Sequence, residues 1–148
     1  MVPCGGGGLA AGTCLARDMV GSSSEVWVAE PIDFDDTRRS LTSGSREINP
    51  TGKTSICDAL LAPTPAELPF EINRKGVARG LVSDDARVLE AMQLLFEEFR
   101  VVVEPGGAVA VAVILSNPTV LRGKVAALVA SGGNVDSGLF EEIIRTAR

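Results

Sequence analysis

The chain has 148 residues, a net charge of −5 and a hydrophobic fraction of 45%, which is typical of one soluble globular domain. Its cations are not clustered, so nucleic acid and anionic membrane surfaces are disfavoured as partners. The sequence contains no histidine, which excludes Ser-His-Asp catalytic systems and histidine-ligated zinc. Cys4, Cys14 and Cys57 lack metal-ligand spacing, and no stretch resembles a membrane span or signal peptide, so we expect reduced core thiols in a cytoplasmic protein.

The first thirty residues follow a strand–helix–strand pattern. Residues 1–4 are interpreted as the tail of a strand, 9–20 as a helix and 26–29 as the next strand, after a turn at residues 21–24. Such units form parallel sheets covered by helices and bind ligands beyond the carboxyl ends of the strands.

Four successive glycines, Gly5 to Gly8, connect this first strand to the helix. Glycine lets the backbone approach an anion, and a helix N-terminus adds N–H donors and a positive dipole end. The run with Leu9 is therefore a candidate phosphate site, although a flexible turn is the alternative on local grounds. Gly6, Gly8 and Ala11 also match a dinucleotide fingerprint, for which Glu30 would be the ribose-binding acid.

The rest of the chain predicts further elements of a three-layer α/β/α domain with a mainly parallel sheet. Polar residues 31–69 are expected to form loops with short helical turns around a site. A helix is predicted to begin at Ser83-Asp84-Asp85, because aspartate suits a helix start and apolar residues follow at helical spacing. The later predictions are a short strand at 101–103, a helix at 108–115 opened by Pro105, a third clear strand at 124–130 and a closing helix at 138–147.

Polar residues at the ends of predicted strands are further site candidates. Ser131 follows the strand at 124–130 and Glu104 follows the one at 101–103. A turn with a helix cap and a helix-start charge are their structural alternatives. The acidic segment 30–36 offers oxygen ligands for Mg²⁺ or Ca²⁺, and a solvated loop is the alternative there.

Five motifs stand in a specific order: Pro3–Leu9, Val28–Pro31 with Asp35-Asp36, Cys57-Asp58, Val103–Val109 and Ser131–Asp136. Together they resemble the threonine dehydratase and serine racemase family of fold-type II pyridoxal-phosphate enzymes. The resemblance covers essentially the whole chain and displaces the dinucleotide hypothesis. It implies the large-domain fold of those enzymes and the conversion of threonine or serine to a 2-oxo acid and ammonia.

The resemblance also implies roles for single residues. Gly5, Gly6, Gly7, Gly8 and Leu9 would cradle the cofactor phosphate. Ser131 would make a hydrogen bond at the pyridine nitrogen, and Gly132 and Glu104 complete the cofactor-binding set. Glu30, the Phe34 carbonyl and Asp36 match the divalent-cation site found in part of the family. Ala59 stands where the family often has glycine after the aspartate.

One departure is large, because the family's Schiff-base lysine motif and its substrate loop are absent from this sequence. Lys53, Lys75 and Lys124 stand in other contexts, so no catalytic residue is predicted. We therefore expect residues 1–148 to form one partial pyridoxal-phosphate-binding domain, a truncated lyase inactive alone. The alternatives are a noncatalytic fragment that associates with a partner chain or a second copy, and an NAD-type half-domain.

Overall fold

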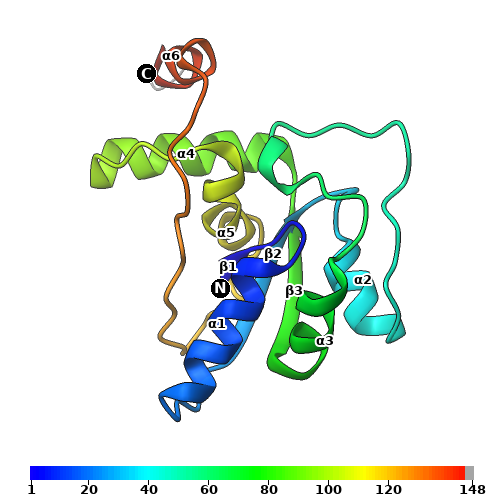
Figure 1. The fold of residues 1–148 in the computed structure, drawn as a ribbon. Coiled ribbons are helices and arrows are strands. Elements are labelled where there is room, and N and C mark those ends of the chain that lie inside the picture. Colours follow the sequence, from blue (N-terminus) through cyan, green and yellow to red (C-terminus); the bar gives the residue numbers. More distant parts are fainter. Residues whose placement is uncertain (146–148) are drawn as a thin grey trace.

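The computed structural model describes residues 1–145 as an α/β fold (Figure 1). Within these residues the sheet has three parallel strands in the order β1-β2-β3, where β1 is Val2–Pro3, β2 is Val26–Pro31 and β3 is Val77–Ser83. All six residues of β2 are buried, as expected for a central strand covered on both faces. The fold-class prediction, α/β with a parallel sheet, is confirmed.

Helices cover both faces of this sheet (Figure 1). On one face lie α1 (Gly8–Met19) and α2 (Asp36–Ser43), and α3 (Glu67–Gly76) packs against both of them. On the other face lies α5 (Pro105–Ser116), followed outward by α4 (Asp85–Phe99) and α6 (Ser137–Arg145). A 3₁₀ turn, η1 (Asp58–Leu60), contacts α5.

Side-chain alternation along β2 divides the core between these two layers. Val28 packs with Ala10 and Cys14 of α1, whereas Ala29 belongs to the cluster that contains most of α5. The small residues of α5 are almost all buried, which lets this helix lie close to the strands. Both faces of the sheet are therefore packed, and the loops after the strands are left to build a site.

Several sequence predictions hold at the level of single elements. The helices expected at 9–20 and 108–115 are α1 and α5, and α4 begins after Asp84, whose side chain accepts a hydrogen bond from the Arg87 N–H at 2.9 Å. The closing helix is α6, and residues 146–147 of that prediction lie outside the described residues. In residues 1–145 no helix is both long and apolar enough to cross a bilayer.

Two strand predictions need correction, and one strand was missed. Residues 101–103 are not a strand, and the third strand of the sheet is β3, which the sequence pattern did not indicate. Residues 124–130 are extended but are not assigned as a strand. The Ala127 carbonyl accepts from the Met1 N-terminal amine at 2.8 Å and the Val129 N–H donates to the Met1 carbonyl at 3.0 Å. These bonds place the segment beside β1 without a continuous ladder.

Candidate functional site

The glycine-rich loop lies directly beyond the carboxyl end of β1. The Cys4 N–H donates to the Ala29 carbonyl at 2.9 Å, which continues the sheet to the start of the loop. Gly7 then adopts a left-handed φ of 89° at the N-cap of α1. A Cβ at Gly6 or Gly8 would meet no atom within 4 Å, so the backbone is open on that side. The loop therefore offers the uncapped N–H groups of a helix start to a ligand.

The other side of the loop is closed by η1 and α3. A Cβ on Gly5 would lie 3.0 Å from the Leu60 Cα, and one on Gly7 would lie 2.8 Å from the Asn73 Nδ2. The Ala66 N–H donates to the Gly6 carbonyl at 3.1 Å and the Asn73 side-chain amide donates to the Gly7 carbonyl at 3.1 Å. Glycine is needed at both contact positions because a side chain would displace the loop.

A second turn, residues 131–134, meets the start of α5. The Glu104 N–H donates to the Gly132 carbonyl at 3.2 Å, and the Asn134 N–H donates to Glu104 Oε2 at 3.0 Å. Gly132 has a left-handed φ of 79°, and a Cβ there would lie 2.5 Å from the Glu104 carboxylate. The structure thus brings together Ser131, Gly132 and Glu104, which the sequence predicted as neighbours in one site.

The two turns are linked through η1. Leu60 lies against Gly5, as the hypothetical Cβ on Gly5 showed. Leu60 also lies against Gly106 in the first turn of α5, where an added Cβ would be 3.2 Å from the Leu60 Cγ. Gly107 in the same turn approaches the Ser131 carbonyl so closely that a Cβ would overlap it, at 1.7 Å. Glycines on both sides of Leu60 therefore bring the loop after β1 and the start of α5 against one 3₁₀ turn.

Glu30, near the end of β2, caps the start of α2. Both Glu30 oxygens are used, because Oε1 accepts from the Thr37 N–H at 2.9 Å and Oε2 from the Arg38 N–H at 2.8 Å. Burial raises the pKa of Glu30 to about 8. Asp36 Oδ1 accepts from the Asn49 side-chain amide at 2.6 Å, and its buried Oδ2 has no hydrogen-bond partner in residues 1–145.

These contacts bear on both ligand predictions made for the acidic segment 30–36. No group of three or more Asp, Glu, Cys or His side chains in the described part of the chain could hold a metal ion. The arrangement gives Glu30 a helix-capping role and offers no support for the cation site of Glu30, Phe34 and Asp36, which stays a prediction. Glu30 is buried and both of its carboxylate oxygens already accept backbone hydrogen bonds, so the structure does not favour ribose binding there either.

All three cysteines are buried and free. Burial raises the pKa of Cys57 to about 12 and raises that of Cys4, so both are held as thiols. The interpretation as core residues is confirmed.

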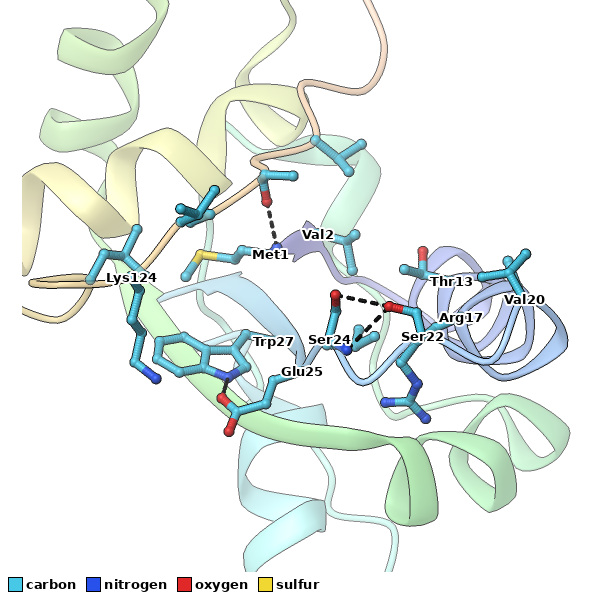
Figure 2. A pocket seen from close by; sticks show the side chains of 17 residues that line it. Met1, Val2, Thr13, Arg17, Val20, Ser22, Ser24, Glu25, Trp27 and Lys124 are labelled. Atoms are coloured by element: carbon cyan, nitrogen blue, oxygen red, sulfur yellow. Dashed lines mark hydrogen bonds between the residues drawn. The ribbon is translucent and has the colours of Figure 1, made fainter.

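A cleft lies at the other end of the strands (Figure 2). It has a volume of about 720 Å³ and is lined by the starts of β1 and β2, the last turns of α1 and residues 121–129. Trp27 donates from Nε1 to Glu25 at 2.8 Å, and Lys124 lies over its ring at 5.6 Å (Figure 2). The cleft is therefore separate from the glycine-rich loop, which follows the carboxyl end of β1.

A sequence profile of pyridoxal-phosphate dependent enzymes matches residues 1–132. The chain belongs to this family. It is 36% identical to a beta-hydroxyaspartate dehydratase of Paracoccus denitrificans over 92% of this chain and 42% of the relative. It is 33% identical to a serine racemase of Dictyostelium discoideum, over 97% of this chain and 45% of that one.

Solved structures agree with this assignment. The crystal structure of the T.th. threonine deaminase has a TM-score of 0.85 and 35% identity, covering 91% of this chain and 49% of that one. The chain spans less than half the length of each of these three relatives. The fold-type II resemblance predicted from the five motifs is confirmed.

The glycine-rich loop has the features needed to hold the phosphate of pyridoxal phosphate, the cofactor of this enzyme family. Open space at Gly6 and Gly8 and a helix start without a side-chain cap are what a bound phosphate requires. Sequence reasoning missed Asn73, the buried amide that contacts this loop. One signal was available, since Asn73 stands three positions after buried Phe70 and so shares the inward face of α3.

Proposed function

We propose that this chain belongs to a pyridoxal-phosphate enzyme that converts a hydroxy amino acid to a 2-oxo acid and ammonia. In that enzyme the chain would contact the phosphate and the ring nitrogen of the cofactor. The observation that carries the proposal is the open glycine-rich loop at the start of α1. The names of relatives support the substrate class, since they include a beta-hydroxyaspartate dehydratase and a threonine deaminase. A serine racemase is 33% identical to this chain, so racemisation is the nearest competing activity.

In this proposal the chain acts mainly through its backbone. The N–H groups of Gly5 to Leu9 bind the phosphate, and the α1 dipole adds a favourable field. Bound pyridoxal phosphate supplies an electron sink for the electrons released at the substrate α-carbon. The Ser131 hydroxyl is neutral, so a hydrogen bond from it would leave the ring nitrogen of a bound cofactor unprotonated and would favour β-elimination. Glu104 keeps the Ser131 turn in place through Gly132 and Asn134.

Turnover further needs an amine that removes the substrate α-proton, and we propose that this chain alone lacks it. Lys53 pairs with Asp33 at 3.1 Å, and Lys124 lies over Trp27 at the amino ends of the strands. Lys75 is exposed near the end of α3. The expected behaviour of the isolated chain is cofactor binding without catalysis.

A titration of the purified chain with pyridoxal phosphate tests both parts, with 2-oxo acid assayed from threonine, serine and hydroxyaspartate. Binding without product supports the proposal, and turnover refutes the absence of a catalytic amine. Ser131→Ala should change the absorbance of the bound cofactor. No binding of pyridoxal phosphate, together with binding of NAD, would favour the nucleotide alternative.

Two finer points belong to the same proposal. A Mg²⁺ or Ca²⁺ site at Glu30, the Phe34 carbonyl and Asp36 would raise thermal stability in the presence of the ion, and an unchanged melting temperature argues against it. We also propose a cytoplasmic location, which suits three buried cysteines that are free of disulfides in the described residues.

The cleft favours a second role, that of one half of an assembly. Val125 is fully exposed, and Met19 and Val20 at the end of α1 are 84% and 77% exposed. Exposed apolar groups around a large cleft are typical of surfaces that another polypeptide covers. We propose that a second copy or a chain carrying the missing lysine binds there. Light scattering across a range of protein concentrations tests self-association, and a monomer at all concentrations excludes the homo-oligomer.

A further inference from the structure

Asn73 is a fully buried side chain that touches the candidate phosphate loop from behind. Its exposed fraction is 0%, and its Nδ2 donates to the Gly7 carbonyl at 3.1 Å from a position 66 residues away in sequence. Its Oδ1 is buried and has no partner among residues 1–145. An amide buried with its oxygen unpartnered is costly to stability. A role in the loop explains why an amide stands there.

The geometry of the peptide bond shows what this contact does. A trans peptide unit is planar, so the Gly7 carbonyl and the Gly8 N–H point in opposite directions. The described residues contain no cis peptide bond. Since Asn73 holds the Gly7 carbonyl toward α3, the Gly8 N–H points away from α3.

The preceding peptide unit is fixed in the same way and from the same helix. The N–H of Ala66, the N-cap residue of α3, donates to the Gly6 carbonyl at 3.1 Å. The Gly7 N–H therefore also points away from α3, toward the open side where Cβ atoms on Gly6 and Gly8 would meet nothing. Two contacts from one helix thus direct two consecutive N–H groups to the side on which an anion can enter.

We propose that Asn73 is a positioning residue for the phosphate site, holding the Gly7 peptide so that the Gly8 N–H faces the ligand. The Ala11 N–H also donates to the Gly7 carbonyl, at 2.9 Å. The Gly7 carbonyl therefore keeps a hydrogen-bond partner when Asn73 is replaced. The contact from Asn73 orients the Gly7 peptide and is not needed to satisfy the Gly7 carbonyl. This inference rests on the proposed function, because it assumes that the loop binds the cofactor phosphate.

The test compares pyridoxamine 5′-phosphate with pyridoxamine. Neither compound has an aldehyde, so adducts with Lys53, Lys75 or Lys124 do not contribute. The full chain should prefer the phosphorylated compound. Asn73→Leu keeps the branched shape and the number of heavy atoms of the side chain and removes its polar atoms, and should weaken pyridoxamine 5′-phosphate binding about tenfold, the loss expected for about one hydrogen bond. Binding of pyridoxamine should not change, and the ³¹P resonance of the bound phosphate should shift.

Stability separates this role from a purely structural one. Asn73→Leu removes the unpartnered Oδ1, so the melting temperature should stay the same or rise while phosphate affinity falls. Phe70→Leu on the same helix is the matched control, since Phe70 is buried but makes no hydrogen bond to the loop through its side chain. It should lower stability and leave the phosphate preference intact.

The outcomes distinguish the two proposals. If the unaltered chain shows no preference for the phosphorylated compound, the proposed function fails and the role of Asn73 fails with it. If the unaltered chain has the preference and Asn73→Leu retains it in full, only the role of Asn73 is overturned. An equal loss in Phe70→Leu would also overturn it, because the effect would then follow from general loosening of α3.

Discussion

The two glycine turns of the candidate site, Gly5–Gly8 and residues 131–133, are held in different ways. The first follows a strand paired with β2 and is fixed from behind by η1 and α3. The second follows residues 124–130, which bond to Met1 at the β1 edge, and Glu104 holds its shape. The proposed phosphate site is therefore built into the packed core, whereas the proposed ring-nitrogen contact depends on a loosely attached segment.

The largest effect is expected at Gly7. Gly7→Ala forces a side chain into a φ of 89° and to within 2.8 Å of Asn73. The strain of about 1–3 kcal/mol should lower both stability and pyridoxamine 5′-phosphate affinity, the latter by about tenfold or more. Urea unfolding and calorimetric titration measure the two quantities.

Gly12→Ala is its control on the same helix. Gly12 lies in the interior of α1 with open space at its Cβ position, so alanine should raise stability by about 0.5–1 kcal/mol. If both variants bind the ligand equally well, the first turn is not the phosphate site.

The next effect concerns the second turn. Gly132→Ala places a Cβ 2.5 Å from the Glu104 carboxylate at a φ of 79°. We expect a loss of stability of about 1–2 kcal/mol and an altered absorbance of bound pyridoxal phosphate, with phosphate affinity changed less than about threefold. Gly123→Ala has a similar φ of 74° but open space, and should cost stability without the spectral change. A tenfold loss of affinity in Gly132→Ala would mean that the two turns act as one unit.

A pH effect is expected beneath the first turn. Burial raises the pKa of Glu30 to about 8 from its ordinary value of 4.5, so the folded chain binds a proton that the unfolded chain releases. Stability from this group is complete below about pH 4.5 and is lost as pH rises through 8. Burial also raises the pKa of Asp36, which adds a slope of the same sign.

Urea midpoints at pH 5.5 and 8.5 check this expectation. The unaltered chain should be less stable at the higher pH, and Glu30→Gln should show a smaller difference between the two values. An unchanged difference in the variant would assign the slope to other groups.

The smallest effect is expected on the segment before the second turn. Val125 is fully exposed, so Val125→Lys should change the free energy of unfolding by less than about 0.5 kcal/mol. Val28→Ala in β2, where the side chain is fully buried, should cost about 1.5–3 kcal/mol. Should Val125→Lys instead lower the melting temperature in a concentration-dependent way, Val125 lies in an interface between copies.

The sequence by itself determined the features that depend on neighbouring residues. The glycine run opening α1, the aspartate start of α4 and proline at the start of α5 were all predicted, because caps and glycine conformations act over a few residues. The order of the five motifs also predicted the family from local sequence alone. Each motif is a short segment whose identity survives without knowledge of the packing.

Tertiary structure decided which segments pair and what lies behind the loop. Residues 124–130 have the apolar run of a central strand, yet a strand needs a continuous ladder, and the bonds of this segment to Met1 do not extend into one. The sequence pattern gave no sign of β3, but it pairs along all of β2, where Gly80 lets Arg38 of α2 lie against it. Asn73 reaches Gly7 across 66 residues, and contacts of that range arise only when helices pack.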